Sequence, residues 1–189
     1  MSAWTEEELG RIDAEDELRI STRRRDGTLR APVTIWVVRL GDDVFIGGQP
    51  TERALRELKE QGVTTVVNLR TPEEMTRFVT FDEAALVRSL GMTYVYIPMR
   101  GTAEFPYSPA AVTKFAEAMR GANGKVLLHC TVAWRASHLW GAYLIKERGI
   151  RIDSALANAR AINLGDERPP IEQFLDQALP TYGRSPRSP

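Results

Sequence analysis

The chain has 189 residues, of which 43% are hydrophobic and 26% charged, a balance typical of one globular domain with a sizeable core. Its 25 Lys and Arg residues equal its 25 Asp and Glu residues in number, which argues against a dedicated nucleic-acid-binding protein. One cysteine and two histidines exclude an internal disulfide, a cysteine-rich zinc site and a multi-histidine metal site. The acidic N-terminus does not resemble a signal peptide and no apolar run is long enough to span a membrane, so we expect a cytoplasmic protein.

The elements predicted for the first part of the chain are a helix and a hairpin. A capping signal and apolar spacing predict the helix at about 5–18. A polar stretch follows, and the apolar runs 33–40 and 44–46 predict a β-hairpin around a Gly-Asp-Asp turn.

From residue 47 onward, strand and helix patterns alternate. The strand-like runs are 63–69, 93–99 and 126–129. Helical patterns are predicted at 51–61, from 72, at 82–90, from 109, at 135–147, at 153–163 with Asp153 as the N-cap, and at 171–179. Strands separated by helices form βαβ units. We therefore expect an α/β three-layer sandwich, with a mostly parallel sheet of four to five strands and helices on both faces.

Ligands of such a sheet bind beyond the carboxyl ends of the strands, where three turns are expected to meet. The third turn begins at Cys130, and Arg135 opens the next helix. A loop between a strand and a helix N-terminus can bind an anion through its backbone N–H groups, and Arg135 can add two parallel donors. This positive potential favours a Cys130 thiolate, a nucleophile beneath a bound oxyanion. The alternative is a buried core thiol at the end of an apolar strand.

Four features follow one another in the chain: Gly-Gly-Gln-Pro from 47, Asn-Leu-Arg at 68–70, Ile-Pro at 97–98 and His-Cys-x4-Arg at 129–135. On these features, the span from about 47 to 165 resembles the bacterial phosphatase-like family also called beta-lactamase hydrolase-like, a relative of the dual-specificity tyrosine phosphatases. The resemblance implies a cysteine phosphatase fold, with Cys130 as nucleophile, Arg135 as phosphate clamp and no metal or organic cofactor. It also implies that the phosphate is bound by the amides of Thr131, Val132, Ala133 and Trp134.

The loop departs from that of familiar tyrosine phosphatases in two ways. Four residues, not five, separate Cys130 from Arg135, a spacing similar to that of rhodanese sulfurtransferases. Ala133 stands where such loops usually carry glycine, which adopts a positive φ at little cost. We therefore expect the loop to be differently shaped or strained at Ala133.

Related phosphatases carry an aspartic acid after Ile-Pro that protonates the leaving group. In this chain the corresponding loop has no aspartate, and Glu104 is its only carboxylic acid. Glu104 is therefore the candidate general acid, with a solvated loop glutamate as the alternative. Arg70 and Arg100 are expected at the same rim, where each either binds an anionic substrate or pairs with a nearby glutamate.

Four further residues near the loop have proposed roles. His129 is expected to support the loop by hydrogen bonding rather than to act as a base. Ser137 is a candidate hydrogen-bond donor to the thiolate, or else a solvated helix serine. His138 is expected at the helix surface. Trp134 either lines the pocket mouth or packs against helices.

Residues 4–46 resemble the opening of an uncharacterised bacterial family thought to adopt a split β-barrel. A barrel cannot close with only its first strands, because an open edge would remain. We therefore expect 1–46 to be an appendage whose hairpin joins the sheet of a phosphatase-like domain at 47–180, followed by a frayed tail at 181–189.

The leading functional prediction is a cysteine-dependent phosphatase that hydrolyses phosphate monoesters through a phosphocysteine intermediate. The alternatives are a sulfurtransferase with a Cys130 persulfide and a non-catalytic phosphate-binding module. The expected partner is a phosphorylated protein or small molecule, with no nucleic-acid or membrane partner.

Overall fold

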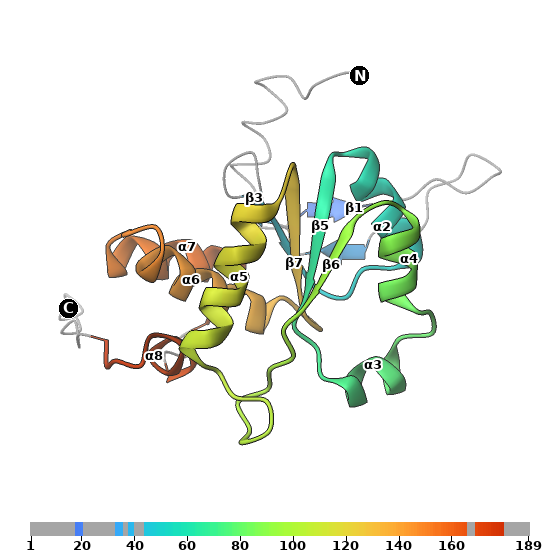
Figure 1. Cartoon of the computed structure of the whole chain (residues 1–189). Coiled ribbons are helices and arrows are strands. Elements are labelled where there is room, and N and C mark those ends of the chain that lie inside the picture. Colours follow the sequence, from blue (N-terminus) through green and yellow to red (C-terminus); the bar gives the residue numbers. More distant parts are fainter. Residues whose placement is uncertain (1–17, 21–32, 36–37, 40–43, 166–168, 180–189) are drawn as a thin grey trace, which may run out of the picture.

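The computed structural model describes residues 18–20, 33–35, 38–39, 44–165 and 169–179. The predicted helix up to residue 17 and the tail at 181–189 lie outside the described residues. β1 (Leu18–Ile20) and β2 (Val33–Ile35) form a separate antiparallel pair. The other described strands form one five-stranded sheet with helices on both sides (Figure 1).

The five-stranded sheet is mostly parallel, as predicted. Its strands are β3 (Val38–Arg39), β4 (Val44–Gly47), β5 (Val63–Asn68), β6 (Thr93–Tyr96) and β7 (Lys125–His129). They lie in the order β3-β4-β7-β5-β6, and only β3 runs antiparallel to its neighbour. The central strand β7 and its neighbour β5 are rich in Val and Leu because both of their faces are covered.

The predicted hairpin is confirmed only near its turn. β3 pairs with β4, but residues 33–35 pair with 18–20 instead of continuing the same strand. β4 has only four residues, so it cannot pair with the whole of the longer run predicted at 33–40. β4 pairs with β7 along its other edge and so joins the hairpin to the main sheet.

The described helices are α2 (Glu52–Glu60), α3 (Pro72–Phe78), α4 (Glu83–Ser89), α5 (Pro109–Gly121), α6 (Trp134–Lys146), α7 (Ile152–Ile162) and α8 (Pro169–Leu175). The bounds predicted for three elements were wrong, and in one of them, α8, the end also lies earlier, at Leu175 instead of 179. β6 ends before Pro98, which has no N–H to continue the ladder. α7 begins one residue before Asp153, whose carboxylate bonds Arg151 at 3.0 Å instead of capping the helix. α8 begins at its proline pair, since proline suits a first helical turn.

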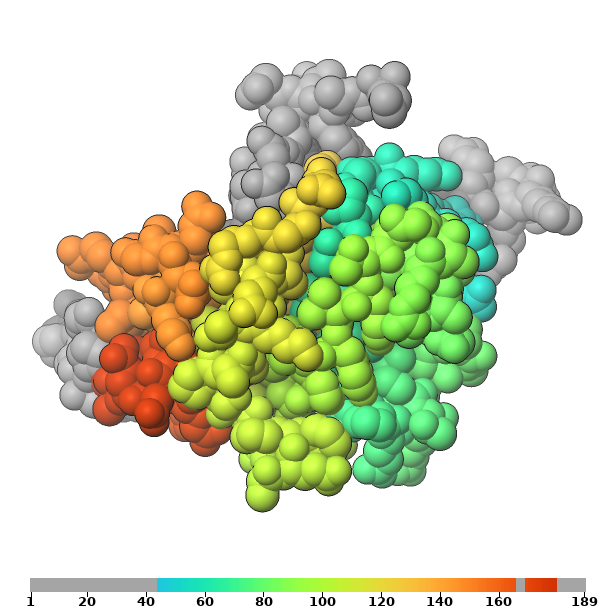
Figure 2. All heavy atoms as spheres, viewed as in Figure 1, coloured from blue at the N-terminus to red at the C-terminus, as the bar shows by residue number. Residues whose placement is uncertain are grey.

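Two apolar cores hold the layers together. The larger one lies between the sheet and the helices α5 to α8, and includes Phe115 and Phe174. The smaller one lies under α2 and α4, with Leu55 and Val87 at its centre. The three-layer prediction is therefore confirmed. The segment between β6 and α5 projects from the lower edge of the molecule (Figure 2).

Candidate active site

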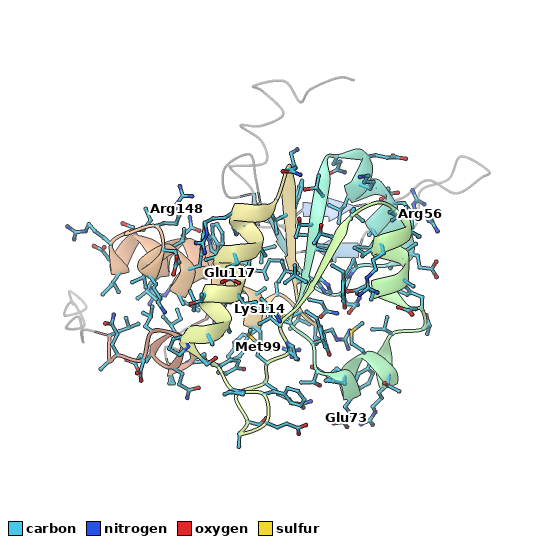
Figure 3. The ribbon with its side chains drawn as sticks, viewed as in Figure 1. Arg56, Glu73, Met99, Lys114, Glu117 and Arg148 are labelled. Atoms are coloured by element: carbon cyan, nitrogen blue, oxygen red, sulfur yellow. The ribbon has the colours of Figure 1, made fainter. Side chains whose placement is uncertain are left out.

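The carboxyl ends of the parallel strands meet around the end of β7. The amide of Leu69, after β5, donates to the carbonyl of His129 at 3.0 Å, and the amide of Met99, after β6, donates to the carbonyl of Leu69 at 3.1 Å. Met99 is labelled in Figure 3, at the start of the projecting segment. The three turns expected at one rim are therefore joined by backbone hydrogen bonds.

The segment after β4 fixes the loop that follows Cys130. The amide of Gln49 donates to the carbonyl of Thr131 at 3.2 Å, and Gly48 forms a β-bridge with Val132. A Cβ atom on Gly48 would lie 2.9 Å from the Thr131 carbonyl oxygen, so any side chain there would displace the loop. This contact explains the glycine at position 48.

Ala133 adopts the left-handed conformation that the sequence suggested would be strained. Its φ is 65° and its ψ is −7°, and it is the N-cap residue of α6. Its carbonyl accepts a hydrogen bond from the Ser137 amide at 2.8 Å, so α6 begins directly after the left-handed residue. A non-glycine residue in this conformation costs about 1–2 kcal/mol.

We expect Ala133→Gly to destabilise the protein far less than Ala136→Gly. Both alanines are buried, so each change removes one methyl group, worth about 0.8 kcal/mol. At Ala136, inside α6, glycine costs about 1 kcal/mol more, whereas at Ala133 glycine relieves the left-handed strain. Denaturant unfolding should separate the two variants by about 2–3 kcal/mol, the sum of the helix cost at Ala136 and the strain relieved at Ala133. Equal losses of stability would contradict a strained Ala133.

Cys130 and Arg135 lie at the floor of this loop, where 1% of Cys130 and 8% of Arg135 are exposed. Arg135 is held by backbone and side-chain acceptors. Its Nη1 donates to the Met99 carbonyl at 2.8 Å and to the Leu69 carbonyl at 3.3 Å, and its Nη2 donates to Thr131 Oγ1 at 2.8 Å. The guanidinium is therefore oriented before any ligand binds.

Glu74 completes the anchoring of Arg135, a role that the sequence analysis missed. Both of its carboxylate oxygens accept from the Arg135 guanidinium, each at 2.8 Å. Thr71 and Glu74 also form a capping box at the start of α3, and Thr131 Oγ1 donates to Glu74 Oε1 at 3.1 Å. The sequence signal was the capping box itself, because it orients this carboxylate at the end of β5.

The environment of Glu74 keeps its carboxyl group ionised. Burial works to raise the pKa of Glu74, but hydrogen bonds from Arg135 and from the Thr71 amide, with the charge of Arg135, lower the pKa to about 2. Burial likewise works to lower the pKa of Arg135, and the bond to Glu74 raises it. The two groups therefore form a partly buried, hydrogen-bonded ion pair.

We expect Glu74→Gln to lower the free energy of unfolding by roughly 3 kcal/mol at pH 7, the equivalent of a pKa shift from 4.5 to about 2. A carboxyl whose pKa is lowered by folding stabilises the protein above its unfolded pKa, and this stabilisation is lost as pH falls toward the folded pKa. The difference between wild type and variant should therefore shrink by about half at pH 3.

Glu73→Gln is the matched control for this prediction. Glu73 is the exposed neighbour of Glu74 on the outer side of α3 (Figure 3). Its replacement should change stability by less than about 0.5 kcal/mol at either pH. Urea unfolding at pH 7 and pH 3 measures both variants, and a pH-independent loss for Glu74→Gln would contradict the ion pair.

Several predicted site residues have other contacts than expected. Arg70 follows β5 as predicted, but it is buried, and it donates to Gln49 Oε1 at 2.8 Å and to the Glu74 carbonyl at 3.2 Å rather than to a glutamate side chain. Ser137 is also buried, and its hydroxyl donates to the Trp134 carbonyl at 2.7 Å rather than to Cys130. His138 is not at the surface but packs on the Trp134 ring, with centroids 4.1 Å apart.

The corrections on α6 share one cause. α6 contacts the sheet, α5, α7 and α8, so its first turns have almost no solvent-facing side. By contrast, Arg100 and Glu104 are exposed on the projecting segment, which folds back where the Arg100 amide donates to the Phe105 carbonyl at 2.8 Å. Trp134 is half-buried and its ring packs against Tyr107, with centroids 6.4 Å apart.

Comparison with known proteins assigns the chain to a family. The model of a family described as "DSP-PTPase phosphatase fused to NAD+ Kinase" matches residues 40–175. The chain belongs to this family. It is a cysteine-dependent phosphatase of the dual-specificity and tyrosine phosphatase class. The class predicted from the sequence is confirmed, whereas the finer beta-lactamase hydrolase-like name is not.

Solved phosphatase structures share the fold of this family member. A protein of the DUF442 phosphatase type from Shewanella putrefaciens CN-32 is 26% identical, covers 74% of this chain and 88% of its own, and has a TM-score of 0.56. PTPMT1 in complex with PI(5)P is 20% identical, with coverages of 75% and 93% and a TM-score of 0.62. TpbA from P. aeruginosa is 18% identical, with coverages of 75% and 84% and a TM-score of 0.56. No curated protein matches the chain significantly.

The front of the chain matches a second family. A model described as an uncharacterised protein conserved in bacteria, DUF2255, covers residues 8–54. The division into an appendage, a domain and a tail stays a prediction, and so does the split-barrel origin of the first 46 residues.

In the described part of the chain no helix has the length and apolar character to cross a membrane, and no cluster of three or more His, Cys, Asp or Glu side chains could hold a metal.

Proposed function

We propose that this phosphatase hydrolyses phosphate monoesters at Cys130, with Arg135 and the amides of residues 131–134 binding the phosphate. The observation that supports this best is the position of Cys130. It lies between the central strand and a helix whose first turn carries an arginine already oriented by Glu74. The proposed substrate is a phosphorylated protein or small molecule in the cytoplasm.

The contacts of Arg135 suggest how it meets the phosphate. Its two terminal nitrogens donate to Glu74, Thr131 and two backbone carbonyls. Among the described residues no acceptor bonds its Nε. The Nε–H group can therefore bind a phosphate oxygen while the ion pair with Glu74 stays intact, and the loop amides supply the remaining donors.

The proposed reaction has two displacements. The Cys130 thiolate attacks phosphorus, an S–P bond forms, and the P–O bond to the leaving group breaks while Glu104 gives its proton to the departing oxygen. Glu104 is the carboxylic acid of the segment between β6 and α5, which projects beside the site. Water then loses a proton to Glu104 and attacks phosphorus, the S–P bond breaks, and phosphate is released.

Hydrolysis of phosphate esters by the wild-type protein tests this proposal, with sulfur transfer from thiosulfate to cyanide measured in parallel. We expect hydrolysis of an aryl phosphate, inhibition by vanadate and no sulfur transfer. If Glu104 protonates the leaving group, alkyl phosphates should react within about 100-fold of aryl phosphates despite their poorer leaving groups. Sulfur transfer without hydrolysis would favour the sulfurtransferase alternative, and phosphate binding without either activity would favour the binding module.

A further inference from the structure

The residue before the nucleophile, His129, has one polar anchor. It ends the central strand β7 and its side chain is 0% exposed. Its Nε2 lies 3.0 Å from Glu83 Oε1, and its Nδ1 has no hydrogen-bond partner among the described residues. The orientation of this ring therefore depends on a carboxylate that comes from the start of α4.

Glu83 is buried as completely as its partner, yet its surroundings favour the charged form. Burial works to raise the pKa of Glu83, but the hydrogen bond and charge of His129, with further bonds from Gln49 and Tyr94, lower the pKa below its ordinary value. Asn68 Nδ2 adds a hydrogen bond to Glu83 Oε1 at 3.0 Å. A carboxylate that accepts this many donors is ionised, so His129 Nε2 carries the shared proton.

Gln49 connects the same carboxylate to the other side of the catalytic loop. Arg70 Nη1 donates to Gln49 Oε1 at 2.8 Å, which orients the amide so that its Nε2 donates to Glu83 Oε2. The Gln49 backbone amide in turn holds the Thr131 carbonyl. Glu83 thus contacts His129, which precedes Cys130 in the chain, and Gln49, which binds the loop that follows Cys130.

We propose that Glu83 is a positioning residue for the Cys130 nucleophile: its carboxylate is the buried hydrogen-bond acceptor that orients both His129 and Gln49. Without this carboxylate the buried Nε2–H group of His129 would lose its acceptor, and an unpaired buried donor is costly. With Glu83 in place, the residues on both sides of Cys130 are held by one buried acceptor. The inference rests on the proposed role of Cys130.

The other ionisable groups around the pair do not replace Glu83. Arg70, after β5, gives its hydrogen bonds to Gln49 and to a backbone carbonyl. Tyr94 and Tyr96 of β6 are partly buried, and burial with the nearby glutamate charges raises the pKa of both phenols, so they stay neutral. Glu74 is paired with Arg135. Among the described residues, Glu83 is the one anion in hydrogen-bond contact with His129.

Glu83→Gln removes the charge and keeps the shape. The amide oxygen can still accept from His129, but the amide nitrogen meets the Gln49 Nε2 group, so that two donors face each other. We expect kcat on an aryl phosphate to fall about 10- to 100-fold, with KM changed by less than about threefold. Alkylation of Cys130 by iodoacetamide at pH 6.5 should slow about tenfold, because the residues on both sides of Cys130 lose their fixed acceptor. The chain has a single cysteine, so mass spectrometry follows that residue alone.

The double variant Glu83→Gln/Gln49→Glu separates charge from structure. It exchanges the carboxylate and the amide between positions 83 and 49. The two donors therefore no longer face each other, and the new carboxylate at position 49 faces Arg70. We expect its melting temperature to return to within about 2 °C of wild type. Its kcat and its alkylation rate should stay low, because the amide oxygen at position 83 is a weaker acceptor for His129 than the carboxylate was.

Two results would overturn the inference. One is recovery of kcat and alkylation rate in the double variant, which would leave Glu83 with a purely structural role. The other is a wild-type alkylation rate in Glu83→Gln. A wild-type protein without phosphatase activity would instead overturn the proposed function. In that case the alkylation rates, which need no turnover, would decide the role of Glu83 alone.

Discussion

Replacement of Cys130 by serine is expected to abolish phosphatase turnover, with a loss of at least about 10⁴-fold in kcat. The serine hydroxyl is far less acidic than a thiol, so the anion that attacks phosphorus is not formed at neutral pH. The substituted side chain is nearly the same size and sits where 1% of Cys130 is exposed, so the loop should keep its shape. Steady-state hydrolysis of an aryl phosphate measures the loss.

Binding measurements provide the control for Cys130→Ser. Because Arg135 and the loop amides remain, the variant should bind inorganic phosphate or tungstate within about threefold of the wild-type affinity. Its melting temperature should also stay close to that of wild type. Residual turnover above about 1% of the wild-type rate, in protein free of wild-type contamination, would rule out Cys130 as the nucleophile.

Arg135→Lys is expected to lower kcat/KM by about 10³-fold, although it preserves the positive charge. Lysine has no planar pair of donors, so it cannot bind both oxygens of Glu74, each now 2.8 Å from the guanidinium, and still bind phosphate. It also leaves the Met99 carbonyl and the Thr131 hydroxyl without the contacts that Arg135 makes. Initial rates at low substrate concentration measure kcat/KM directly.

Arg120→Lys is the matched control for that change. Arg120 lies on α5 in an exposed pair with Glu147, with 3.5 Å between the charged atoms. Its replacement by lysine should leave kcat/KM within about twofold of wild type, because exposed pairs contribute little and α5 carries no proposed site residue. An Arg135→Lys variant as active as this control would mean that charge alone, without the guanidinium geometry, binds the phosphate.

Most of the fold was predictable because its signals are local. The capping box of α3, the apolar stripes of the helices and the buried runs of β5 and β7 each depend on a few neighbouring residues. These signals also place Cys130 between a strand and a helix. The hairpin was only partly predictable, since the short β4 limits how much of the run at 33–40 can pair with it.

The features of the candidate site were likewise predictable only where they depend on neighbouring residues. The left-handed Ala133 could be anticipated from the missing glycine, because the conformational cost belongs to that residue itself. The burial of Arg70, Ser137 and His138 could not, because it depends on how many elements pack around α6 and the end of β5. Exposure of a polar side chain is a property of the packed layers rather than of its own helix.

The class of the protein and its α/β layers could be read from the amino-acid sequence, and so could the candidate nucleophile Cys130 with the loop and arginine that follow it. Which carboxylates contact that loop depends instead on the packing of the layers. Glu74 is separated from Arg135 by 61 residues and Glu83 from His129 by 46. No local pattern links residues at such separations. They come together because parallel strands bring their carboxyl ends to one edge of the sheet, and the helices that follow carry these two glutamates back to it.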